Sequence, residues 1–201
     1  MYRIRNLLLL LGIISPITAY TSISLAIINA PWFSWRKNAL SDLGVWGNSA
    51  IIFNSGLMIS AITQIAFIVG LSLHYTKALS RAGSAVYLLA SIMLFLIGLY
   101  PESAGKIHFY VSLLFFILTP TSLIVLSASL IKEYGFIRFG LATLLIAILS
   151  FSPWLIPWRS LDVRGVAIPE LLSTIPVSAW NIYVALKLIV GSKFKIYFKS
   201  N

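Results

Sequence analysis

Long apolar stretches separated by short polar segments run along the whole chain. The stretches cover about residues 6–30, 47–74, 82–100, 107–131, 136–157 and 166–190. Each is near the roughly 20 residues that an α-helix needs to cross about 30 Å of hydrocarbon. No shift in composition marks a domain boundary between them. The pattern therefore predicts an all-α integral membrane protein, in which a bundle of six transmembrane helices forms a single domain over residues 1–201.

The composition agrees with a chain that lives in a lipid bilayer. Of the 201 residues, 59% are hydrophobic and only 10% are charged, and the mean hydropathy is +0.95. An ordinary soluble domain has about a quarter of its residues charged. The first stretch follows Arg3 and Arg5, as in a signal peptide, but it runs on to Ala30 without a good cleavage site, which favours a retained helix. Because the chain has no cysteine, disulfides and thiolate metal sites are excluded.

The basic residues predict the orientation of the bundle. With the N-terminus inside, the cytoplasmic segments hold ten of the fifteen lysines and arginines: Arg3, Arg5, Lys77, Arg81, Lys132, Arg138, Lys187, Lys193, Lys195 and Lys199. The outer segments hold the other five: Arg36, Lys37, Lys106, Arg159 and Arg164. This excess predicts a multi-pass protein of the cell membrane with both termini cytoplasmic. The net charge of +10 then serves orientation and contact with anionic membrane lipids, so we expect no nucleic-acid partner. Protein partners stay open.

The acidic residues gather on the opposite side. Asp42, Glu102, Asp162 and Glu170 fall in the predicted outer segments, and only Glu133 falls inside. Acidic residues contribute little to orientation, so topology does not require this bias. The outer loops of a six-helix bundle can converge, and each of them brings at least one ionisable group. The outer end is therefore where we look for chemistry.

The first acidic group is the segment LSDLGVWG at residues 40–47, where the first outer loop turns back into the membrane. Ser41 and Asp42 are residue types that cap helix starts, because their side chains accept hydrogen bonds from the free backbone N–H groups there. An aspartate at the mouth of a bundle is equally suited to act as a ligand or a general base. Asn54 and Gln64 continue a polar trace down the second span. Both interpretations stay open from the sequence.

The second group is the segment GLYPESAGKIHF, in which Pro101 ends the third span and Glu102 precedes His108 by six residues. A short turn brings these two side chains near each other. Ser112 lies four residues after His108, on the same helical face. Histidine exchanges a proton near neutral pH, and a neighbouring carboxylate can orient its ring. The alternative is a histidine at a helix start that is bonded to a loop carbonyl.

The third group begins at Glu170, where Pro169 marks the start of the last span. Thr174, Ser178 and Asn181 follow Glu170 at helical spacing and form one polar stripe. A carboxylate at membrane depth is costly unless it is paired, so Arg159 or Arg164 is the expected partner of Glu170. If Glu170 lies at the level of the lipid headgroups, it is only a solvated helix start.

The chain resembles the archaeal membrane proteins grouped as domain of unknown function 998. The resemblance rests on NALSDLG at 38–44, FNSGL at 53–57, YPE with a following histidine at 100–108, and IPE at 168–170. It covers essentially the whole chain. The resemblance implies a compact multi-span membrane protein without an established activity, and it points to the positions Ser41, Asp42, Glu102, His108 and Glu170.

A more distant and partial resemblance is to transmembrane hydrolases typified by the alkaline ceramidases, which use a serine, an aspartate and several histidines around zinc. Ser41, Asp42 and His108 could stand in for part of that set. Those enzymes carry an H-x-x-x-H pair in a late span, and this sequence has none; its other histidine, His74, lies at the cytoplasmic end of the second span. A site with one histidine would bind zinc poorly, whereas a histidine together with carboxylates would suit a harder metal ion or no metal at all. Whether a metal binds stays open.

Common catalytic signatures are missing from the sequence. It has no G-x-S-x-G elbow, no H-E-x-x-H motif and no nucleotide-binding G-x-x-x-x-G-K loop. With one histidine on each side of the membrane, a paired-histidine haem site is not expected, and neither is a nucleotide site. Whether the protein is an enzyme at all is not decided by the sequence.

Three functions of different classes fit the sequence. The first is a membrane-embedded hydrolase or transferase that acts at the outer face on a lipid or lipid-linked substrate. The second is a small ion-coupled transporter, and the third is a non-catalytic accessory or scaffold subunit. For the enzyme, His108 is the expected proton carrier, Glu102 or Asp42 orients it, Ser41 is the nucleophile and Arg159 holds an anionic headgroup. The candidate catalytic residues are Ser41, Asp42, Glu102, His108 and Glu170, and the candidate substrate-binding residues are Asn54, Arg159 and Ser112.

Overall fold

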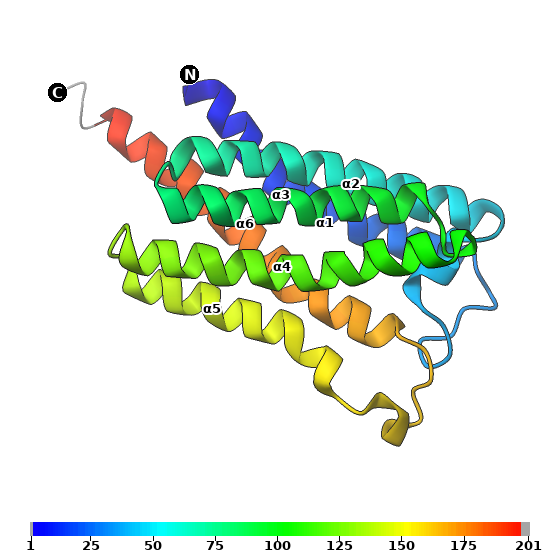
Figure 1. The fold of residues 1–201 in the computed structure, drawn as a ribbon. Coiled ribbons are helices and arrows are strands. Elements are labelled where there is room, and N and C mark those ends of the chain that lie inside the picture. Colours follow the sequence, from blue (N-terminus) through cyan, green and yellow to red (C-terminus); the bar gives the residue numbers. More distant parts are fainter. Residues whose placement is uncertain (1, 198–201) are drawn as a thin grey trace.

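The computed structural model of the chain is a bundle of six long helices (Figure 1). The structure describes residues 2–197, with side chains over residues 4–191. The helices are α1 (Tyr2–Ile28), α2 (Gly47–His74), α3 (Ala78–Leu99), α4 (Lys106–Lys132), α5 (Ile137–Phe151) and α6 (Ala167–Tyr197). In the described part of the chain each is long and apolar enough to cross a membrane, the fifth when it is counted on to Leu155, and there are no strands. The predicted fold class is confirmed.

The fifth predicted span is longer than the helix that forms there. The helix α5 ends at Phe151 and continues as two short 3-10 helices, η3 (Ser152–Leu155) and η4 (Trp158–Leu161). Pro153 and Pro157 lack the N–H that would extend an α-helix, so the chain leaves the helical path here. The other five helices agree with their predicted spans to within a few residues.

The two ends of the bundle differ in charge. The described parts of both terminal helices meet at one end, together with the short turns 75–77 and 133–136 (Figure 1). The other end holds the three longer loops, with η1 (Leu40–Gly44), η2 (Glu102–Ala104), η3 and η4. We call it the acidic end, because Asp42, Glu102, Asp162 and Glu170 lie there. The assignment of this end to the outside of the cell stays a prediction, which labelling of single cysteines at Ser103 and Thr76 in intact cells would test. Among the basic residues on which the predicted orientation rests, the side chains of Arg3, Lys193, Lys195 and Lys199 are not described by the structure.

The six helices form a closed ring. Each helix packs against the next along the chain, and α6 also packs against α1. Near the termini the ring is filled by an apolar core that includes Leu9, Phe67, Leu71, Leu123 and Val184, all almost fully buried. Burial of apolar side chains in the middle of a bundle excludes lipid and water alike. The open space of the ring therefore lies in the half towards the acidic end.

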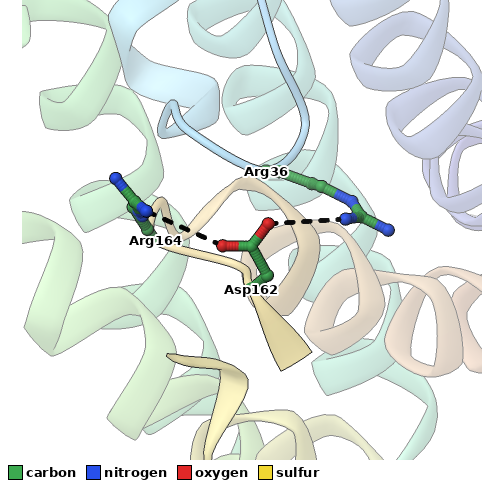
Figure 2. A network of polar contacts seen from close by, with 3 residues as sticks. All are labelled: Arg36, Asp162 and Arg164. Carbon is green, nitrogen blue, oxygen red and sulfur yellow. Dashed lines mark ion pairs between the residues drawn. The ribbon is translucent and has the colours of Figure 1, made fainter. Parts of the chain in front are cut away.

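Two loops of the acidic end are bonded to each other through their backbones. Arg36 O accepts the N–H groups of Arg164 at 2.7 Å and Gly165 at 2.9 Å, and Asn38 O accepts the N–H of Ala167 at 3.0 Å. The Asp162 carboxylate lies 3.8 Å from both the Arg36 and the Arg164 guanidinium groups, which are 65% and 80% exposed (Figure 2). Exposed ion pairs contribute little, so the backbone bonds are what fix this contact. The contact sets the position of α6 against η1.

Candidate functional site

Three loops bring the predicted site residues together at the acidic end. The Ser41 hydroxyl on η1 donates to Glu102 Oε2 on η2 at 2.9 Å. The neighbouring backbone N–H of Leu40 donates to Glu170 Oε2, at the start of α6, at 2.6 Å. Ser41 is buried and the two glutamates are partly buried. The segment 40–42 thus connects two carboxyls that are far apart in the sequence.

Asp42 organises the loop in which it lies. Its Oδ2 atom accepts the Asn38 side-chain amide at 2.7 Å and the Ala39 backbone N–H at 3.0 Å. Through the second bond the carboxylate caps the start of η1, which is the capping role left open by the sequence. The Asp42 carboxyl also lies beside that of Glu102, close enough to share a hydrogen bond. Asp42 therefore holds η1 in place. With Glu102 and Glu170 it forms a group of carboxyls that we call the acidic cluster.

The environment of Glu102 favours its protonated form. Burial raises the pKa of Glu102 first, and the hydrogen bond with the Asp42 carboxyl raises it further. The bond from Ser41 and the nearby His108 act in the opposite direction but do not outweigh the first two. The neighbouring Asp42 carboxyl therefore favours a proton on Glu102.

We expect the protein to lose stability as the pH rises through the pKa of Glu102. The folded-state pKa lies above the ordinary value of 4.5, so protonated Glu102 stabilises the fold fully below that value and the contribution disappears above the raised pKa. The variant Glu102→Gln keeps a neutral side chain at every pH. Its melting temperature, measured in detergent between pH 4 and 8, should vary less with pH than that of the wild type. If the melting temperature of Glu102→Gln varied with pH as much as that of the wild type, the raised pKa of Glu102 would be contradicted.

His108 is buried at the start of α4, with both ring nitrogens bonded. Its Nδ1 lies 2.8 Å from the Tyr100 carbonyl oxygen, and its Nε2 lies 3.3 Å from Ser112 Oγ. A carbonyl only accepts, so Nδ1 carries the proton and Nε2 accepts from the Ser112 hydroxyl. The ring is therefore oriented by a backbone carbonyl, which is the alternative that the sequence left open beside a carboxylate. The serine next to it is Ser112, and the predicted nucleophile Ser41 is bonded to Glu102 instead.

A large cavity opens inside the ring below the acidic cluster. Its volume is about 110 Å³, and it is open to the surroundings at its mouth. All six helices and η1 line it, and of the predicted site residues Ser41, Ser112 and Glu170 contribute to its wall. On α2 and α6 the lining extends down to Gln64 and Asn181, near the middle of those helices.

Polar side chains lie deep inside this cavity. Ser15 donates to the Ser60 carbonyl at 3.0 Å and to Gln64 Oε1 at 3.3 Å, which joins α1 to α2. The hydroxyls of Thr119 and Ser173 are buried without a hydrogen-bond partner. Ser15 and Ser60 were missed in the sequence because a serine in an apolar span has no signal of its own; only helix packing places them on a common wall.

Several predicted contacts do not form. Glu170 was expected to pair with Arg159 or Arg164, but among the described residues neither is within ion-pair distance, and Arg164 lies by Asp162 instead. Arg159 is exposed on η4 and is not among the residues that line the cavity. The chain turns away after Pro157, which carries Arg159 out of reach. Asn54 donates to the Gly44 carbonyl at 2.9 Å and so supports η1 from below, outside the cavity lining.

The acidic cluster does not have the geometry of a metal centre. Within the described part of the chain, no three histidine, aspartate or glutamate side chains lie close enough to hold one metal ion. The geometry instead offers a histidine–serine pair on the wall of a cavity and a carboxyl cluster at its mouth.

Comparison with known proteins identifies a family. The family model described as a protein of unknown function (DUF998) matches residues 13–187. No curated protein and no solved structure matches the chain. The predicted membership is confirmed, whereas the archaeal character and the resemblance to the alkaline ceramidases stay predictions.

Proposed function

Because this chain belongs to the DUF998 family, whose description names no activity, we propose its function from the site: a membrane-embedded hydrolase or transferase that acts on a lipid or lipid-linked substrate at the acidic end. The observation that carries the proposal is the Ser112 hydroxyl. It lines the cavity and is bonded to His108 Nε2, while Nδ1 of the same ring is held by the Tyr100 carbonyl. A nucleophile, a base and a group that orients the base are the parts of a serine-dependent acyl transferase or hydrolase.

The chemistry follows from this arrangement. Ser112 Oγ attacks the carbonyl carbon of an ester or amide while its proton moves to His108 Nε2. The leaving group takes that proton as its bond to the acyl carbon breaks, which leaves an acyl group on Ser112. Water, or the hydroxyl of an acceptor lipid, then attacks the acyl carbon and returns a proton through His108 to Ser112. The Tyr100 carbonyl, which accepts from Nδ1, holds the ring with Nε2 towards Ser112 throughout these steps.

The cavity suits a substrate that enters from the membrane. Apolar side chains such as Phe53, Leu57 and Phe115 form much of its wall, whereas the acidic cluster lies at one end. An acyl or isoprenoid chain would occupy the apolar part, and the headgroup would remain at the carboxyls. The cleavable bond would then lie beside Ser112, six residues into α4.

The experiment is to treat the purified protein, in nanodiscs, with a long-chain fluorophosphonate and to map the modified residue by mass spectrometry. Such reagents react with serines that an adjacent base activates. We expect modification at Ser112, no modification in Ser112→Ala, and full modification in the control Ser72→Ala, in which a serine bonded only to its own helix is changed. A protein that is not modified at Ser112, while it retains its melting temperature, would contradict the proposal and favour an accessory or scaffold subunit.

An ion-coupled carrier is a second candidate, favoured by the shape of the cavity. The cavity is lined from the acidic end down to Gln64 and Asn181, and the apolar core with Phe67 and Leu123 closes the half beyond. A carrier in one of its two access states has this shape, and a proton held by Glu102 is a natural coupling ion. Acidification of the lumen of proteoliposomes on addition of substrate would support it, and Glu102→Gln should abolish the signal.

A further inference from the structure

The charged groups that face the cavity all have the same sign. Among the described residues, Glu170 is the charged side chain on the cavity wall, and no lysine or arginine lines it. Asp42 and Glu102 lie next to Glu170, near enough to act on its charge. The basic residues of the acidic end are exposed and stand away from the mouth: Arg36, Lys37, Lys106, Arg159 and Arg164. A ligand in this cavity thus meets carboxyl groups at the mouth and no basic side chain on the described wall.

A second, independent feature lies deeper. Thr119 on α4 and Ser173 on α6 line the cavity with hydroxyls that have no hydrogen-bond partner, and their exposed fractions are 6% and 4%. Buried hydroxyls are normally bonded, so these two call for a partner that the chain does not supply. Thr119 lies seven residues beyond Ser112, which is about 10 Å along the helix at 1.5 Å per residue. A ligand with a polar atom below its headgroup would supply such a partner.

We propose that the cavity binds a cationic amphiphile: an ammonium group against Glu170 and its neighbouring carboxyls, an apolar body against the aromatic and aliphatic wall, and a hydroxyl or amide within reach of Ser173 and Thr119. This inference deepens the proposed function, because it names the substrate class for the same cavity. It replaces the anionic headgroup that the sequence suggested through Arg159.

The selectivity has a direct electrostatic origin. An ammonium beside a partly buried carboxylate forms a charge-assisted hydrogen bond in a medium that screens poorly. A carboxylate or phosphate headgroup at the same place is repelled and finds no cation on the wall. The rejection of anions is therefore as much a part of the proposal as the attraction of amines.

The experiment is photo-crosslinking in nanodiscs made of phosphatidylcholine. The probe is a dodecylammonium that carries a diazirine at its chain end, and labelled residues are mapped by mass spectrometry. We expect labels on cavity residues such as Phe53 and Phe115. Unlabelled dodecylammonium should compete at a concentration at least roughly tenfold lower than dodecanoate, because a favourable and an unfavourable charge contact differ by at least that factor. Equal competition, or stronger competition by dodecanoate, would overturn the proposal.

Variants separate charge from fold. Glu170→Gln should remove the preference for the cation, whereas Glu170→Asp should keep it. The control is Glu133→Gln at the opposite end of the bundle, where Glu133 accepts from Ser129 at 2.6 Å. If Glu170→Gln fails to fold, the competition pattern of the wild type and of Glu170→Asp still decides. A preference that survives in folded Glu170→Gln contradicts the role of this carboxyl.

The deeper hydroxyls are tested with a second competitor. An alkylammonium with a hydroxyl at mid-chain should compete better than an alkylammonium without one. The variant Thr119→Val, which keeps the shape of the side chain, should reduce that advantage. If the hydroxyl gave no advantage in the wild type, the role given to Thr119 and Ser173 would be contradicted. Binding is measured here without turnover. Cation-selective labelling together with an unreactive Ser112 would uphold this inference and reject the enzyme, whereas a reactive Ser112 without cation preference would do the reverse.

Discussion

Replacing His108 with alanine is expected to slow the fluorophosphonate modification of Ser112 by roughly 10²–10⁴-fold, the range found when a general base is lost. The reason is geometric. In the neutral ring His108 Nε2 accepts from Ser112 Oγ at 3.3 Å, because the Tyr100 carbonyl accepts the proton carried by Nδ1. The second-order rate constant of modification, followed by mass spectrometry, measures the effect.

Two comparisons distinguish a chemical role of His108 from a structural one. Added imidazole should restore part of the rate in His108→Ala, because the cavity next to Ser112 is large enough to admit it. Tyr100→Phe should react like the wild type, since the bond to Nδ1 comes from the backbone. If His108→Ala folds and its Ser112 reacts at the wild-type rate, the role of His108 is limited to its hydrogen bond at the start of α4.

The largest effect on stability is expected from Gly165→Ala. A Cβ atom at Gly165 would overlap the backbone of the first loop, where it meets Asn38 O and lies 2.6 Å from the carbonyl carbon of Lys37. Backbone atoms cannot move aside as a flexible side chain can, so overpacking here should cost about 1–3 kcal/mol. The two loops would separate, and the bond from Leu40 N to Glu170 would be weakened. Thermal unfolding in detergent measures the loss.

The matched control is Gly191→Ala. Its Cβ would meet no atom within 4 Å, and the residue lies in helix α6. Alanine favours a helix over glycine, so the melting temperature should stay the same or rise. Equal melting temperatures for Gly165→Ala and the wild type would show that the loop contact yields easily and does not hold α6 against η1.

The convergence of acids at one end was predictable for a simple reason. Alternate loops of an antiparallel bundle emerge on the same side, so the distribution of Asp42, Glu102 and Glu170 along the sequence already placed them at one depth. Depth alone does not say which side chains touch. Glu102 contacts Ser41 because η1 folds over η2, and a turn of 3-10 helix leaves too little pattern to predict its direction.

The partners of His108 show a second limit. Six residues separate it from Glu102, and proximity suggested that this carboxylate would orient the ring. The end of α3 instead directs the Tyr100 carbonyl at Nδ1. Backbone carbonyls are present at every residue, so no sequence motif marks the one that will bind a histidine. Capping by Asp42 was one of the two interpretations that the sequence left open, because its side chain acts on residues close to it in the sequence.

The sequence by itself determined the membrane class, the six helices and the end of the bundle at which the acids gather, because each depends only on local composition and on the length of apolar runs. The tertiary structure alone decided the ring closure of α6 on α1, the cavity inside it, the pairing of Ser112 with His108 and the exclusion of Arg159. These features depend on the rotation of each helix about its axis. In lipid that rotation is set by packing against neighbouring helices, and an apolar span looks nearly the same from every side.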